Sequence, residues 1–187
     1  MNWPETELGQ IAEFRNGLNY TKENEGTGLR VINVKDFGDR SFPNYDSLGE
    51  LNPHGILRED ALLRDGDVIF VRSNGNKDLV GRSLYIASPP EKVSFSAFCI
   101  RARFNDPGVA RFYSYFFRTP HFRKRLALLG RGTNISNLNQ QVLNKIRVPS
   151  LTSVAMSRVV ALISRYDDLI ENNRRRIQLL EQAARLL

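Results

Sequence analysis

The last 32 residues of the chain, from Met156 to Leu187, carry an unbroken heptad pattern of apolar side chains. Nine of the ten a and d positions are apolar, Asn173 is the polar exception, and no Gly or Pro interrupts the segment. The pattern predicts one helix, about 48 Å long at roughly 1.5 Å per residue, whose apolar seam needs a second helix to cover it. The predicted helix–helix interface contains Val159, Ile163, Tyr166, Ile170, Asn173, Ile177, Leu180 and Ala184.

Positive charge is concentrated in the middle of the chain. Residues 61–154 hold 15 Lys/Arg against 5 Asp/Glu, a net charge of +10, whereas residues 1–60 carry −5. A clustered positive field suits a polyanion, because neutralising phosphates and releasing counterions drives such binding. The charge distribution favours a nucleic-acid partner over a basic protein with an ordinary solvated surface.

Composition and cysteine usage indicate a folded protein in a reducing compartment. The 187 residues are 41% apolar, enough for one globular domain with a core. The single cysteine, Cys99, lies in an alternating apolar run, so we expect a buried structural thiol. No signal-peptide pattern and no apolar run of membrane-spanning length is present, so we expect a cytoplasmic protein with no membrane association.

Local patterns in residues 1–104 predict one short helix followed by strands. The helix covers residues 6–17, with Thr6 as its cap and Gly17 at its end. Alternation and β-branched residues predict the strands. The apolar helix face comprises Leu8, Ile11, Ala12 and Phe14, and the strands cover residues 29–37, 68–71, 83–87 and 94–104.

Helical periodicity replaces alternation after Pro107. We expect a helix with Phe112, Tyr115 and Phe116 facing inward, broken or restarted at Pro120. A short helix at residues 140–144 and a strand at 146–149 follow. Strands first and helices later predict an α+β fold: a globular mixed domain over residues 1–150, followed by a long helical region over 151–187.

The familiar enzyme motifs are absent from the sequence. It contains no phosphate-binding loop, no dinucleotide-binding glycine pattern, and only two histidines, His54 and His121, which we expect on the surface. Asp65 and Asp67 are spaced like the start of a carboxylate metal site, but an Asp-Gly pair before a strand favours a tight turn. We therefore predict no metal site and no catalytic residue, with a small metal-dependent nuclease as the less favoured alternative.

Two polar loops within the positive segment are candidates for reading DNA. The loops span residues 73–82 and 130–137 and combine glycines with Asn, Ser, Thr, Lys and Arg. Asn and Arg have paired donors and acceptors that match adenine and guanine edges. Two ordinary surface loops are the alternative. The predicted DNA-binding residues are Arg72, Asn74, Asn76, Lys77, Arg82, Arg131, Thr133 and Asn134.

The order of several segments resembles one half of the DNA-specificity subunit of type I restriction–modification systems. The likeness covers nearly the whole chain, and it depends on the order of the segments and on the terminal helix. The segments are LGQIAEFRNG, LRVINVKDF, LLRDGDVIFVRSNGNKDLVGRS, NISNLNQQVLNKIRVPSL and DDLIENNRRRIQLLEQ.

The resemblance implies a non-catalytic protein. It implies a target recognition domain at 1–150 that binds one half of a bipartite site in double-stranded DNA, and a conserved helical region at 151–187. The partners it implies are a methyltransferase (modification) subunit and a restriction/translocase subunit. S-adenosylmethionine, ATP and Mg would be bound by those subunits, and this chain would bind no cofactor.

The chain departs from the full family pattern in two respects. It has one recognition domain and one helix, and residues 149–158 read PSLTSVAMSR instead of the usual Pro-Pro-Leu and Gln. The heptad pattern also runs to the last residue, so we expect either a natural half-length protein or a piece of a longer one. A coiled-coil scaffold protein with an incidental basic surface is the alternative function.

The seam also predicts how two copies pair. In an antiparallel pair centred between Ile170 and Asn173, every a residue lies opposite a d residue, and Asp167 lies near Arg174 of the other copy. A polar residue near the centre of such a seam fixes its register. We expect an antiparallel homodimer, or the equivalent pairing with a second half in a full-length chain. The helix would then set the distance between two recognition domains.

Overall fold

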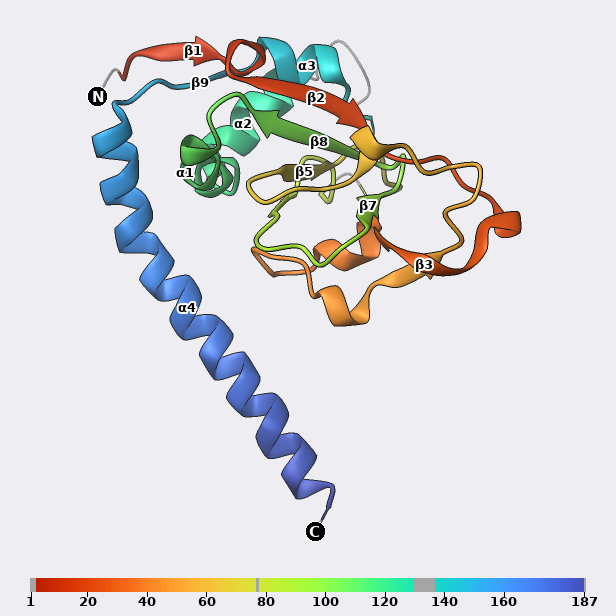
Figure 1. Ribbon diagram of the computed structural model, residues 1–187. Coiled ribbons are helices and arrows are strands. Elements are labelled where there is room, and N and C mark those ends of the chain that lie inside the picture. Colours follow the sequence, from red (N-terminus) through yellow and green to blue (C-terminus); the bar gives the residue numbers. More distant parts are fainter. Residues whose placement is uncertain (1–2, 77, 130–136, 187) are drawn as a thin grey trace. The chain divides into compact units, whose positions relative to one another are not determined.

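The computed structural model describes residues 3–76, 78–129 and 137–186 (Figure 1). The chain divides into two units, Met1–Leu151 and Thr152–Leu187. Within the described ranges, the first unit contains all the strands and three α-helices, and the second is a single long helix. Helices and strands therefore combine as the predicted α+β fold. None of the helices in the described ranges is both long and apolar enough to cross a bilayer.

A four-stranded sheet forms the middle layer of the first unit (Figure 1). All neighbouring strands run antiparallel. The predicted strand at Val68–Val71 is confirmed, and all four of its residues are buried because both faces of the sheet are covered. In spatial order the strands are β2 (Ala12–Asn16), β8 (Cys99–Phe104), β5 (Val68–Val71) and β6 (Ser83–Tyr85).

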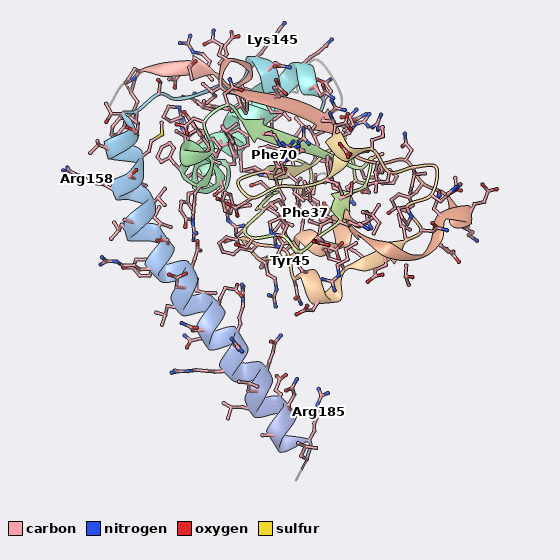
Figure 2. The ribbon with its side chains drawn as sticks, viewed as in Figure 1. Phe37, Tyr45, Phe70, Lys145, Arg158 and Arg185 are labelled. Carbon is pink, nitrogen blue, oxygen red and sulfur yellow. The ribbon has the colours of Figure 1, made fainter. Side chains whose placement is uncertain are left out.

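Two helices cover one face of this sheet through aromatic packing. Asp106 caps α1 (Pro107–Phe117) by accepting a hydrogen bond from Gly108 N, and α2 (Pro120–Leu129) begins at the predicted proline. Phe70, labelled in Figure 2, lies on strand β5. The Phe117 ring lies 4.9 Å from its ring. The buried residues of α1 include Phe112, Tyr113 and Phe117, not the predicted Tyr115 and Phe116. The apolar stripe was thus predicted with the wrong phase, because aromatic residues occupy nearly every side of the helix.

A second sheet and several 3-10 helices cover the opposite face. Strand β3 pairs antiparallel with β4 and parallel with β7. Their side chains join those of β5 and β8 in a core that includes Phe37, Ile69 and Cys99. The strands are β4 (Gly49–Leu51), β3 (Glu25–Ile32) and β7 (Val93–Phe95), and the 3-10 helices are η2 (Lys22–Asn24), η3 (Val34–Phe37), η4 (Tyr45–Ser47) and η5 (Glu59–Ala61).

Cys99 is buried and free, as predicted. Burial raises the pKa of its thiol to about 12. The thiol is therefore protonated at neutral pH and behaves as a small apolar side chain.

Three predicted strands differ in extent from the structure. The strand predicted at 83–87 ends at Tyr85 as β6. The strand predicted at 29–37 ends at Ile32, where Asn33 and Asp36 form a capping box that turns the chain into η3. The strand predicted at 94–104 is interrupted at residues 96–98, so β7 joins the second sheet and β8 the first. A turn closed by Cys99 N donating to Ser96 O (2.9 Å) causes this break.

The predicted N-terminal helix is wrong. Residues 5–16 instead form β1 (Glu5–Glu7), η1 (Leu8–Gln10) and β2. Strand β1 pairs with β9 (Arg147–Pro149), and β2 pairs with β8 along its whole length. Apolar residues at these positions fit both periods, and pairing with strands far along the chain decides the outcome. The predicted helix at 140–144 is confirmed as α3 (Gln140–Lys145).

The second unit is α4 (Ser153–Ala184), which confirms the predicted long helix. Thr152 caps it, with its hydroxyl accepting a hydrogen bond from Ala155 N. Within the helix Arg174 pairs with Glu171 at 2.6 Å. Large apolar side chains remain exposed along α4: Val154, Val159, Leu162, Tyr166, Leu169, Ile170, Ile177, Leu179 and Leu180.

Candidate nucleic-acid interface

The first predicted loop, residues 73–82, joins β5 to β6 and has a closed base. Gly81 N donates to Val71 O, and Val71 N donates to Arg82 O, both at 2.9 Å. These bonds bring the two ends of the loop together at the end of the buried strand β5. The loop is therefore an extension of the central sheet and not a free connection.

Asparagine side chains shape the tip of this loop. Asn74 Oδ1 accepts from Asn76 N at 2.8 Å, and Asn76 Oδ1 accepts from Asp78 N at 3.0 Å. These two Asx turns use the carbonyl oxygens of both amides. No described residue accepts a hydrogen bond from the NH₂ group of either side chain. Those NH₂ groups are donors that a base or phosphate oxygen can accept from.

Helix α2 holds the other side of the loop. Arg123 donates from Nη1 to Val80 O and from Nη2 to Asp78 O, both at 2.8 Å. Gly81 has φ +78°, a backbone conformation that strains any other residue, and a Cβ there would lie 2.2 Å from Leu126 Cδ2 and displace that side chain. Burial, followed by the nearby charge of Arg82, lowers the pKa of Arg123.

The second predicted loop returns to the base of the first. Ser73 and Asn137 form an antiparallel bridge, and Leu138 N donates to Arg72 O at 2.7 Å. The structure thus brings together the start of one loop and the end of the other, although more than 60 residues separate them in the sequence. Four predicted contact residues lie outside the described residues: Lys77, Arg131, Thr133 and Asn134.

Arg72 and Arg82 occupy different surroundings from each other. Arg72 is half-buried and donates from Nη1 to Ala97 O at 3.2 Å, so it supports the turn between β7 and β8. Arg82 donates to Gly38 O at 3.3 Å and lies 3.9 Å from the fully exposed Asp39 carboxylate. Of the two, Arg82 has the position from which a guanidinium can meet a ligand.

An open cavity of about 720 Å³ lies beside the loop, with three guanidinium groups in its wall. Arg118 and Arg123 come from the helices and Arg82 from the loop. Arg118 is held by Nη1 donating to Arg40 O at 2.8 Å. Sequence reasoning missed Arg118 and Arg123, because nothing in the sequence separates them from helical arginines that point elsewhere. The remaining lining residues are Phe37, Gly38, Asp39, Asp78, Ser83 and Phe117.

Other arginines of the positive segment are bound within the fold. Arg103 forms a bidentate pair with Asp67 at 2.8 and 2.7 Å, and Asp67 also accepts from Arg64 N. Arg125 pairs with Glu5, which lowers the pKa of that carboxyl. The field around the loops is therefore weaker than the charge count alone indicates.

The two aspartates considered for metal binding serve the local turn. Asp67 is 1% exposed, and Gly66 at φ +85° occupies the turn that precedes it. Asp65 Oδ1 accepts from Ser88 N at 2.7 Å. Within the described residues no three His, Cys, Asp or Glu side chains converge as metal ligands. This arrangement favours the tight turn over the nuclease interpretation.

The chain was compared with known proteins. No protein-family model matches it. It is 23% identical to the StySPI specificity subunit of a type I restriction enzyme from Salmonella potsdam, over 85% of this chain and 35% of that protein. It is also 23% identical to the EcoKI specificity subunit of Escherichia coli K12 and 25% identical to the MjaIX subunit of Methanocaldococcus jannaschii, covering 85% and 95% of this chain. The chain spans between a third and two fifths of the length of these relatives.

Solved structures show the same fold. The S subunit of a type I system from M. genitalium matches this chain with a TM-score of 0.59 at 15% identity. The match covers 91% of this chain and 41% of that subunit. The HsdS subunit of Thermoanaerobacter tengcongensis matches it with a TM-score of 0.59 at 18% identity. This match covers 91% of this chain and 38% of that subunit. In sequence and in fold, this chain resembles one half of the specificity subunit of a type I restriction–modification system.

Proposed function

We propose that this chain is a DNA-specificity subunit of a type I restriction–modification complex and that its first unit reads one half of a bipartite site. The observation that carries the proposal is the extent of the similarity. The alignments with specificity subunits cover 85 to 95% of the length of this chain but only 34 to 40% of the length of those subunits. A half-subunit with one recognition domain and one helix has this relation to a protein built of two such halves.

The arrangement of the loops supports DNA as the ligand. Asn74 and Asn76 present amide donors at the tip of a loop with a fixed base, as direct readout of a base edge requires. Arg82 and Arg118 line a neighbouring cavity from which guanidinium groups can meet phosphates. Base-reading and phosphate-positioning groups thus lie on adjoining parts of one unit.

In this proposal the chain itself carries out no chemistry. Methylation would be carried out by a modification subunit that binds S-adenosylmethionine, and translocation and cleavage by a restriction subunit that uses ATP and Mg. The specificity chain supplies the sequence reading and a docking surface for both. Residues 1–150 would form the recognition domain, and residues 151–187 the spacer and docking region.

The exposed seam of α4 supports pairing of two such helices. Tyr166, Ile170 and Ile177 are about half exposed or more, and a helix with this stripe is stabilised when a second helix covers it. The antiparallel register sets a residues against d residues and places Asn173 of both copies close to the centre. The partner helix belongs to a second copy or to the second half of a longer chain, and its length then fixes the spacing of the two half-sites.

Binding of the full chain to duplex DNA tests the proposed function. We expect the chain to prefer one DNA sequence and its affinity to fall steeply between about 50 and 200 mM salt. Fluorescence anisotropy measures this for the chain alone and for the chain with the methyltransferase subunit of the same host. A scaffold protein would dimerise without sequence preference for DNA. Failure to bind duplex at the lowest salt, with the methyltransferase subunit present, would reject the proposal.

Cysteine crosslinking tests the direction of the helix pair. The double variant Val159→Cys/Ala184→Cys should form a disulfide-linked dimer on oxidation, because the two positions lie opposite each other in an antiparallel pair. Val159→Cys alone should not crosslink, whereas a parallel pair would link it to its own copy. The native Cys99 is buried and does not compete. A crosslink in the single variant would overturn the antiparallel arrangement.

A further inference from the structure

One phenylalanine of the chain stands apart from the rest in its exposure. The chain has 11 phenylalanines, all within the described residues, and ten of them are buried or half-buried. Phe98 is 61% exposed. Leaving an aromatic ring in water forgoes the free energy of its burial, and a ligand that covers the ring recovers it. A single exposed ring is common on protein surfaces, so the surroundings of Phe98 decide whether it has a role.

The backbone of Phe98 is held in place from three directions. Cys99 N closes the turn on Ser96 O, and Ala97 N donates to Leu18 O at 2.8 Å. Arg72 N and Ser73 N donate to Phe98 O at 2.8 and 3.3 Å. The ring is thus carried by a fixed turn, and its covering by a ligand would require little ordering of the chain.

The turn adjoins the base of the two polar loops. Ser73, whose amide bonds to Phe98 O, is also the residue that bridges to Asn137. Asn74 follows at once, and its Oδ1 accepts from Asn76 N. Phe98 therefore lies at the edge where the first loop begins and the second ends.

Among the described residues, none that forms a hydrogen bond with the Phe98 turn does so through a carboxylate. Arg72 donates to Ala97 O, and Gln140 Nε2 donates to Asn16 Oδ1 at the end of β2, opposite Ile100. Arg72 and Ser73 thus bond to the turn that carries the exposed ring, and guanidinium, amide and hydroxyl side chains of this kind are the groups that contact nucleobases. A protein partner would more commonly meet several apolar side chains gathered in one patch.

We propose that Phe98 is the apolar base contact of this interface: its ring packs against a nucleobase of the bound duplex, next to the base edge read by the Asn74 loop. This inference rests on the proposed function and adds a residue to it. The ring can make this apolar contact in two ways: against the face of a base exposed at an opened step, or against a thymine methyl group in the groove.

The test compares Phe98→Ala with the wild-type chain on the duplex that the wild-type chain enriches from a random pool. We expect about tenfold weaker binding, with an unchanged slope of log affinity against log salt, because the ring carries no charge. Phe98→Trp should bind within about twofold of wild type. Trp3→Ala removes another exposed aromatic residue of the unit, 56% exposed, and should leave affinity unchanged.

Two modified duplexes distinguish the sources of the base contact. If 2-aminopurine at one step brightens with wild type and not with Phe98→Ala, the ring opens that step. If uracil in place of one thymine weakens the wild type alone, the ring contacts that methyl group. Wild-type affinity in Phe98→Ala, in a variant with the wild-type unfolding midpoint, would overturn the inference while leaving the proposed function intact. Absence of DNA binding by the wild-type chain would instead reject the proposed function.

Discussion

The arginines of the positive segment form two groups with different surroundings. In the first group, Arg103 is held by the buried Asp67, and Arg101, 3% exposed, donates to Asp60 O at 2.7 Å. In the second group, Arg82 donates to Gly38 O at 3.3 Å and Arg118 donates to Arg40 O at 2.8 Å, and both side chains line an open cavity. The first group fastens the η5 segment to β8. The second leaves positive charge facing solvent, so residue counts alone do not measure the charge that a phosphate meets.

The largest expected effect comes from breaking the first group. Asp67→Ala leaves the Arg103 guanidinium without its bidentate partner and removes the acceptor for Arg64 N, so we expect a loss of about 3 kcal/mol in the free energy of unfolding. Urea denaturation measures this. Asp78→Ala, an exposed carboxylate of the polar loop, should change stability by no more than about 0.5 kcal/mol. Equal stabilities for the two variants would show that the buried pair has no structural role.

The second group should affect binding and not folding. Arg82→Ala and Arg118→Ala should each weaken duplex binding about five- to tenfold near 100 mM salt, and together lower the log–log salt slope by about 2. Arg147→Ala removes the same charge from β9, beside Glu5, and serves as the control. If Arg147→Ala weakens binding as much as the cavity variants do, net charge and not the cavity accounts for the affinity.

A smaller effect is expected at the loop tip. Asn74→Ala should reduce discrimination against a single base-pair change by about 1–2 kcal/mol while leaving the salt slope unchanged. Asn74→Ser keeps an oxygen that can accept from Asn76 N and removes the NH₂ donor, so it should lose discrimination as well. Retained discrimination in Asn74→Ser would assign the effect to the turn and not to a base contact.

The smallest effect concerns the ion pair between Glu5 of β1 and Arg125 of α2. The hydrogen bond from Arg125 lowers the pKa of Glu5 below its ordinary value, so the carboxylate stabilises the fold above that ordinary pKa and loses this effect as pH falls through the lower pKa of the folded state. Glu5→Gln should cost less than about 1 kcal/mol at pH 7, since both groups are partly exposed. The difference should disappear in acid. If the difference in free energy of unfolding between Glu5→Gln and wild type instead grows as the pH falls, the predicted pH dependence is wrong.

Sequence patterns predicted the elements that local forces decide. The heptad pattern gave α4, and the apolar run Val68–Val71 gave β5. Residues 6–17 were misassigned because their apolar spacing fits a helix and a strand equally, and the choice depends on β8 and β9, far along the chain. The break at residues 96–98 likewise depends on Leu18 and Arg72.

The candidate site was predictable in part for the same reason. Composition identified the loop with Asn74, Asn76 and Arg82, since polar residues with glycine mark a loop wherever it folds. The cavity arginines Arg118 and Arg123, and the exposed ring of Phe98, could not be identified, because their positions depend on contacts between elements distant in sequence.

Selection from random duplex DNA tests the central claim most directly. The full chain, alone and with the methyltransferase subunit of its host, would be used to enrich bound duplexes for sequencing. The account predicts a bipartite motif, with two identical half-sites in opposite orientation at one fixed spacing if two copies pair through α4. Enrichment of no sequence under either condition would contradict it.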